Sequence, residues 1–225
     1  HCKVLTAAEI FPIGPAFPEP GLAACEDKAG QIPGTRAKLA AGEAVTIVYW
    51  GDSVTCGGDA SSPETAFPLA LTNWLRCRYP DARIRHVNAG TGGWNSRSKL
   101  PLFEEQVLAH KPDLVVIEFV NDMGFPRATI FANYADAVGR IRAGGGEVIV
   151  LTPHFVRPDW MPGNQGLRTP ETRDAVTFLR EFCAENGVGL ADTSRRWEHL
   201  WVEGLPYLTL LRNGINHPDD RGHAL

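Results

Sequence analysis

A serine in a glycine-rich segment is the first residue whose setting indicates chemistry. Ser53 follows Gly51 and Asp52 directly, and further glycines come shortly after it. The preceding residues 47–50 are β-branched or aromatic, which is typical of a buried parallel strand. Open α/β sheets bind ligands at the carboxyl ends of such strands. Ser53 is therefore a candidate nucleophile, although Asp and Ser at this point could instead begin and cap a helix.

A serine nucleophile needs a base and a set of oxyanion donors. Of the seven histidines, His217 is the one in a loop beyond the last expected strand, free to fold back over the sheet. The oxyanion needs preorganised donors, and Gly93 and Asn121 stand at the ends of the second and third expected strands. The competing interpretations are a turn residue for Asn121 and an ordinary surface loop at His217.

Elements of alternating type must position these residues. The expected strands span 45–51, 84–87, 113–120, 147–152 and 188–191. The expected helices span 63–78, 97–110, 128–143, 170–187 and 193–203. Apolar strands that alternate with helices predict an α/β protein, in which a parallel sheet is covered by helices on both faces.

Four segments of the chain, taken in order, resemble the sequence blocks of the SGNH hydrolases, the grouping that contains the GDSL esterases and lipases. The resemblance covers about residues 44–225. The matching segments are Gly51-Asp52-Ser53, then Asn88 to Gly93, then Val120-Asn121-Asp122, and last His217-Pro218 with Gly222-His223 after it.

The resemblance implies a fold and a chemistry. The fold would be a flavodoxin-like three-layer α/β/α sandwich with a five-stranded parallel sheet in the order 2-1-3-4-5. Ser53 would be the nucleophile and His217 the base, with Ser53, Gly93 and Asn121 forming the oxyanion hole. The reaction would be ester hydrolysis through a serine-bound acyl intermediate, and we expect neither a cofactor nor a metal.

The chain departs from the family pattern at the acid of the triad. The usual Asp three residues before the His is replaced by Gly214. One hypothesis is a Ser53–His217 dyad, oriented by a neutral acceptor in 213–216 such as Asn213. The other is a remote carboxylate, for which Asp192 at the end of the fifth strand is the best candidate. Asp219 and Asp220 are expected to cap the helix that follows Pro218 instead.

Aromatic and polar residues near the expected cleft indicate the substrate class. Trp94 adjoins Gly93, while His154, Arg157 and Trp160 follow the fourth strand. Such a cleft suits sugars better than a long acyl chain. We therefore expect deacetylation of a carbohydrate, small or polymeric, or of another short-acyl ester. The alternatives are a lipase-like esterase or thioesterase acting on longer chains, a catalytically silent binding module, and tryptophans that merely pack loops.

Composition limits the remaining possibilities. The 225 residues are 44% hydrophobic with a net charge of −4, which gives no electrostatic basis for binding nucleic acid. No apolar run reaches membrane-spanning length, so the sequence predicts a soluble protein, without indicating a secreted or a cytoplasmic location. Residues 1–42 are rich in Pro and Gly and are expected to be an arm or the remnant of an upstream domain, with 43–225 as the hydrolase domain. Cys2 could pair with Cys25, or all five cysteines could be free thiols.

Overall fold

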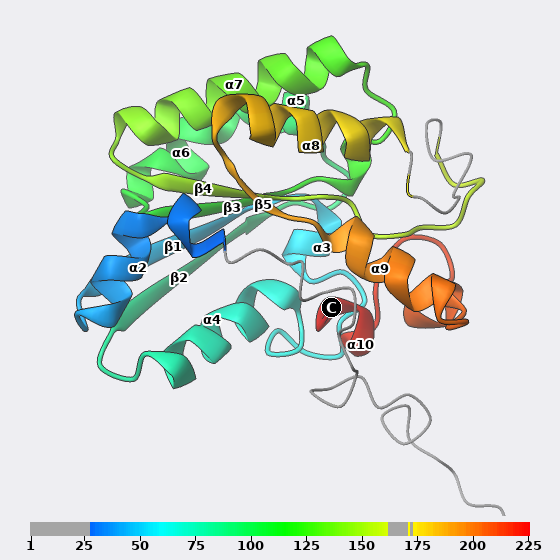
Figure 1. Ribbon diagram of the computed structural model, residues 1–225, viewed down its shortest axis with the longest axis horizontal. Coiled ribbons are helices and arrows are strands. Elements are labelled where there is room, and N and C mark those ends of the chain that lie inside the picture. The colour runs from blue at the N-terminus through cyan, green and yellow to red at the C-terminus, as the bar shows by residue number, and fades with distance from the viewer. Residues whose placement is uncertain (1–27, 162–170, 172) are drawn as a thin grey trace, which may run out of the picture.

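The protein is built around a parallel sheet of five strands (Figure 1). The computed structural model describes residues 28–161, 171 and 173–225. The strand order is β2-β1-β3-β4-β5, which confirms the predicted topology and three-layer fold. The strands are β1 (Ala44–Gly51), β2 (Arg83–Gly90), β3 (Leu114–Glu118), β4 (Glu147–Leu151) and β5 (Gly189–Ala191).

Helices cover both faces of the sheet. One face carries α5 (Ser96–Lys99), α6 (Phe103–Gln106), α7 (Arg127–Ala143) and α8 (Asp174–Asn186), and the other carries α2 (Pro33–Ala40) and α4 (Phe67–Arg78) (Figure 1). The helix α3 (Ser53–Cys56) follows β1 directly, while α9 (Thr193–Val202) and α10 (Asp220–His223) come late in the chain. Five 3₁₀ segments complete the described elements: η1 (Lys28–Gln31), η2 (Leu100–Leu102), η3 (Leu108–His110), η4 (Val120–Asp122) and η5 (Tyr207–Leu210).

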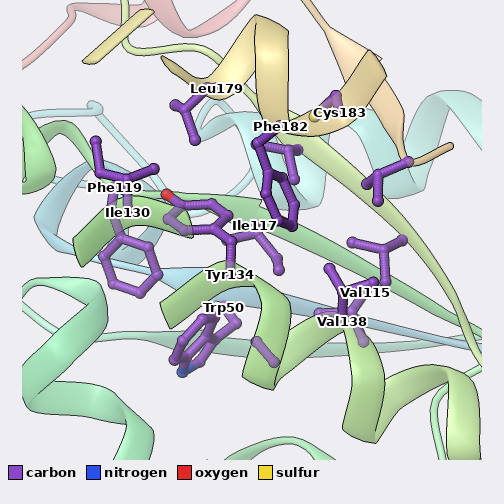
Figure 2. Close-up of a cluster of buried hydrophobic side chains, with 14 of the residues drawn as sticks. Trp50, Val115, Ile117, Phe119, Ile130, Tyr134, Val138, Leu179, Phe182 and Cys183 are labelled. Atoms are coloured by element: carbon purple, nitrogen blue, oxygen red, sulfur yellow. The ribbon is translucent and has the colours of Figure 1, made fainter. Parts of the chain in front are cut away.

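The largest core cluster lies between the sheet and helices α7 and α8 (Figure 2). Trp50 of β1 is fully buried and makes edge-to-face contacts with Phe103 and Phe119, at centroid distances of 4.8 and 4.7 Å. Aromatic pairs in this geometry add to the stabilisation from burial alone. The strands β1 and β3 are therefore anchored in a tightly packed core just before their carboxyl ends.

Two parts of the chain differ from the expected elements. The single helix expected over 97–110 is divided into α5, η2, α6 and η3, because Pro101 cannot donate a backbone hydrogen bond within a continuous helix. The range assigned to the Pro- and Gly-rich arm contains α2, whose Gly34 and Thr35 N–H groups both donate to the Glu147 carboxylate. Cys2 and Cys25 lie outside the described residues. Among the helices that are described, none has the length and apolar character needed to cross a bilayer.

Candidate active site

The candidate nucleophile lies at the first residue of α3, where the chain turns sharply away from β1. Asp52, rather than Ser53, is the capping residue, and its Oδ1 accepts the Val54 N–H at 3.0 Å. A Cβ at Gly51 would lie 2.0 Å from Thr55 Oγ1 and 2.2 Å from the Glu118 carbonyl. Only glycine at that position allows α3 to pack this closely on the strand ends.

Three side chains form a continuous hydrogen-bonded series at this edge of the sheet. His217 Nε2 lies 2.9 Å from Ser53 Oγ, and His217 Nδ1 lies 2.9 Å from Asp59 Oδ2. The His217 side chain is 24% exposed and that of Asp59 37%, so both remain accessible to a substrate or to water. A hydroxyl, an imidazole and a carboxylate in this order form the arrangement that makes a serine nucleophilic.

The structure has a remote carboxylate at His217, as the second hypothesis expected, but it is neither Asp192 nor the neutral acceptor of the first hypothesis. The Asn213 Oδ1 accepts the backbone N–H groups of Ile215, Asn216 and His217, so it shapes the loop and does not contact the ring. Asp192 is held by the Arg180 guanidinium at 2.9 Å and by the Thr152 hydroxyl. Both carboxylate oxygens of Asp192 are therefore used elsewhere, and the carboxylate at the ring is that of Asp59.

Sequence reasoning missed Asp59, whose placement depends on backbone conformation. Asp59 adopts a left-handed φ of 62°, which is uncommon for a residue with a Cβ. Next to it, a Cβ on Gly58 would lie 3.1 Å from His217 Cε1 and 2.9 Å from the Ser53 carbonyl. The one available signal was the glycine pair just before Asp59, which permits a close approach to an aromatic ring.

Helix α10 holds the loop that carries Asp59. As expected, Asp219 caps this helix by accepting the Arg221 and Gly222 N–H groups, each at 3.0 Å. Asp220 was also expected to be a cap, but its carboxylate reaches across to accept the Ser61 N–H at 2.7 Å. A ring nitrogen of His223 lies 3.2 Å from the Gly58 carbonyl. The segment that follows His217 thus positions the loop that supplies its carboxylate.

The candidate oxyanion donors come from three different turns. Gly93 has a φ of 76° within the turn that the Trp94 N–H closes onto the Thr91 carbonyl. A Cβ at position 93 would meet no atom within 4 Å, so glycine is favoured there by its backbone conformation. Within the described residues, no acceptor is recorded for the N–H of Ser53 or Gly93. Both donors are free to bind a ligand.

Asn121 is fixed at both its backbone and its side chain. Its N–H donates to Asp52 Oδ2 at 2.9 Å, and its Nδ2 donates to the Trp94 carbonyl at 2.8 Å. One of the two Nδ2 hydrogens is therefore used to orient the amide, and the other remains for a ligand. Burial raises the pKa of Asp52 to about 7, against the opposing effect of the Asn121 and Val54 N–H groups.

The four candidate substrate-contact residues differ in their surroundings. Trp94 is 37% exposed beside the oxyanion turn and stays a candidate. His154 is 4% exposed, with Nε2 2.8 Å from the Asn216 carbonyl, and burial lowers its pKa to about 3. His154 therefore donates to the His217 loop as a neutral imidazole, and its contact with substrate stays a prediction. Arg157 pairs with Asp159, and Trp160 packs against the main core cluster.

Comparison with known proteins places the chain in a family. Residues 49–225 match the model of the GDSL-like lipase/acylhydrolase family. The chain belongs to that family. The matched range contains all three members of the Ser53–His217–Asp59 series and all three candidate oxyanion donors.

A sequence relative and several solved structures are similar to the chain. An acetylxylan esterase from Geobacillus stearothermophilus is 34% identical over 95 residues, which is 42% of that protein. A two-domain esterase active on acetylated mannans has a TM-score of 0.72 at 22% identity, and the match covers 87% of this chain and 51% of that one. A catalytic mutant of an acetylxylan esterase from G. stearothermophilus gives 0.63 at 20% identity, over 80% and 89%.

The length covered and the sequence identity of these matches decide what they show. The chain spans about half the length, or less, of the curated esterase and the two-domain esterase. At 20–22% identity, the structural matches support the fold alone.

Proposed function

We propose that this protein is a serine ester hydrolase that acts through an acyl-enzyme intermediate. The observation that carries the proposal is the Ser53–His217–Asp59 series, with 2.9 Å at both hydrogen bonds, in a member of an acylhydrolase family. Nucleophile, base and orienting acid are within hydrogen-bond reach without any rearrangement.

The reaction follows from the roles of these groups. His217 Nε2 accepts the Ser53 hydroxyl proton as Oγ attacks the ester carbonyl, and Asp59 stabilises the imidazolium that forms. The N–H groups of Ser53 and Gly93 and the Asn121 amide stabilise the tetrahedral oxyanion. His217 then protonates the leaving alcohol. A water molecule, activated by the same imidazole, releases the acid and restores Ser53.

We propose a short acyl group on a carbohydrate as the substrate. The half-exposed Trp94 beside the oxyanion turn offers an aromatic surface on which a sugar ring can pack. The similarity to an acetylxylan esterase and to an esterase active on acetylated mannans supports the same substrate class.

One observation favours a second candidate, an esterase for longer acyl chains. A mainly apolar cavity of about 580 Å³ lies against the face of the sheet that carries α4. Its lining includes Val54 and Pro218, which follow Ser53 and His217 in the chain. An acyl chain that entered this cavity would be bound by the hydrophobic effect.

A rate series separates the two candidates. Initial rates would be measured with acetyl, butyryl and octanoyl aryl esters and with acetylated xylo- and manno-oligosaccharides, using Ser53→Ala as the blank. The proposal predicts that acetyl esters turn over fastest and that acetylated oligosaccharides release acetate. Faster turnover of octanoyl esters would favour the second candidate, and activity retained in folded Ser53→Ala would overturn both.

A further inference from the structure

The three turns that carry the candidate oxyanion donors are linked by buried charged side chains. Asp52 joins two of these turns, because one carboxylate oxygen accepts the Val54 N–H in α3 and the other accepts the Asn121 N–H in η4. The Asp52 side chain is completely buried. A carboxylate that accepts two backbone N–H groups fixes their relative position more firmly than neutral contacts would.

Lys99 binds the third turn, which contains Gly93. This lysine is completely buried in α5, and its ammonium donates to the Ala89 carbonyl and, at 2.8 Å, to Thr91 Oγ1. Thr91 in turn accepts the Trp94 N–H, which closes the turn containing Gly93. The ammonium therefore binds the first residue of the turn that presents the Gly93 N–H.

The negative charge of Asp52 favours the charged form of the buried Lys99. Burial lowers the pKa of its ammonium to about 8, while the negative charge of Asp52 raises it. A buried ammonium is costly unless its charge is paired and its protons are hydrogen-bonded. The hydrogen bonds to Ala89 and Thr91 offset part of this cost, and they depend on the present positions of residues 89–91.

Asp122 connects η4 to α5. Its Oδ1 accepts the Ser96 N–H at 2.9 Å, and the Ser96 hydroxyl is itself bound by Asn133 Nδ2 at 2.8 Å. Ser96 begins the helix that carries Lys99. Burial raises the pKa of Asp122 to about 6, while the Ser96 N–H lowers it. Asp52, Asp122 and Lys99 therefore connect α3 to η4, η4 to α5, and α5 to the Gly93 turn.

We propose that Asp52, Lys99 and Asp122 form a buried charged frame that preorganises the oxyanion hole. The inference rests on the proposed function and names three positioning residues for it. None of them is a donor to the oxyanion. Each acts through the turns that it holds in place, and those turns present the oxyanion donors, as preorganised electrostatic stabilisation requires.

Lys99→Met tests the frame, because methionine has a similar length but carries no charge and donates no hydrogen bond. We expect kcat for an aryl acetate to fall about 10- to 10²-fold with KM almost unchanged, since a misplaced donor weakens transition-state binding alone. Lys38→Met is the matched control. Lys38 is 45% exposed and pairs with Asp113. Asp113 immediately precedes β3 and so lies at the amino ends of the strands, opposite the candidate active site. Its replacement should leave kcat unchanged.

A double-mutant cycle distinguishes positioning from a general structural role. If the frame acts through the oxyanion hole, Lys99→Met should cost much less kcat in an Asn121→Ala background than in the wild type. Equal losses in the two backgrounds, or wild-type kcat in folded Lys99→Met, would overturn the frame. The proposed function would survive either result, because it depends on the separate losses in Ser53→Ala and Asn121→Ala.

Thr91→Val provides a second, nearly isosteric variant should Lys99→Met fail to fold. It removes the hydroxyl acceptor at 2.8 Å from the ammonium and leaves the charge in place. A loss of kcat that is again non-additive with Asn121→Ala supports the frame, and an additive loss or none overturns it.

Discussion

Asp59 is the member of the proposed triad that the sequence did not predict. Its carboxylate lies 2.9 Å from His217 Nδ1. An orienting acid holds the correct imidazole tautomer and stabilises the imidazolium. We therefore predict that Asp59→Asn lowers kcat by about 10²- to 10⁴-fold, up to the loss expected when a triad acid is neutralised. Steady-state hydrolysis of an aryl acetate by the wild type and by Asp59→Asn measures the change in kcat.

Asp192→Asn is the matched comparison for Asp59. It neutralises the carboxylate that the sequence favoured, which the structure pairs with Arg180. This variant should keep most of the wild-type kcat at a temperature where it is folded. The reverse pattern, with a large loss in Asp192→Asn and a small one in Asp59→Asn, would exclude Asp59 as the acid.

Asn121 tests the oxyanion hole at the same scale. Asn121→Ala removes one side-chain donor, so we predict a decrease in kcat of about 10²- to 10³-fold with little change in KM. Kinetics with an acetyl ester would provide both constants. A raised KM with unchanged kcat would mean that the amide binds ground-state substrate instead.

Residue types predicted the nucleophile and base but not the acid. Ser53 and His217 could be paired from the sequence because each stands in a recognisable block at the end of an expected element. Asp59 contacts a ring 158 residues away, through a left-handed backbone conformation that is uncommon outside glycine. The glycine pair at 57–58 permits a close approach, but it does not identify His217 as the residue that approaches.

At the scale of elements, the site depends on how closely α3 packs against the ends of β1 and β2. Gly51 and Gly90 are register partners in these strands. A Cβ on Gly90 would lie 2.2 Å from the Cys56 N and 2.6 Å from the Thr55 carbonyl carbon. Both are backbone atoms of α3, so the helix would have to move.

Gly90→Ala should therefore displace the helix that begins at Ser53. We predict a loss of at least about 10²-fold in kcat, because an ångström-scale displacement of a reacting group has this effect. Overpacking should also lower the unfolding free energy by about 1–3 kcal/mol. Gly139→Ala in α7 is the control, since a Cβ there would meet nothing and alanine favours a helix. Full activity in Gly90→Ala would contradict the packing argument.

The elements themselves were largely predictable, and their exceptions have local causes. The strands follow from apolar and β-branched runs, the long helix α7 from its end at the glycines 144–146, and the helix after Pro218 from its Asp cap. The 97–110 segment was not predicted correctly because Pro101 interrupts it. The helix α2 was missed because its eight residues have little amphipathic pattern and depend on Glu147, far along the chain, to bind their N–H groups.

For the whole molecule, the buried ionisable groups predict how stability depends on pH. Burial lowers the pKa of His154 to about 3. As pH falls, the unfolded chain therefore binds a proton at His154 before the folded protein does. The contribution of His154 to stability is lost as pH falls below about 6.5. Burial raises the pKa of Asp52 to about 7 and of Asp122 to about 6. Their contribution acts in the opposite direction and is lost as pH rises from about 4 toward those values.

His154→Gln isolates one of these opposing effects. Glutamine can still donate to the Asn216 carbonyl but cannot take up a proton in this range. Between pH 7 and pH 4, we predict that the wild type loses about 3 kcal/mol more unfolding free energy than the variant. Denaturant unfolding of both proteins at the two pH values measures the difference, and parallel pH profiles would contradict the prediction.

The central claim is that Ser53 forms a covalent acyl intermediate, and trapping that intermediate is the most direct test. The protein would be mixed with excess aryl acetate, quenched in acid within the first turnovers, digested and analysed by peptide mass spectrometry. Asp59→Asn would be treated in parallel as a more slowly reacting variant. The mechanism predicts one acetyl group on the peptide containing Ser53 in the wild type, and none in Ser53→Ala. Turnover that proceeds with Ser53 unmodified, or with the acetyl group on another residue, would contradict it.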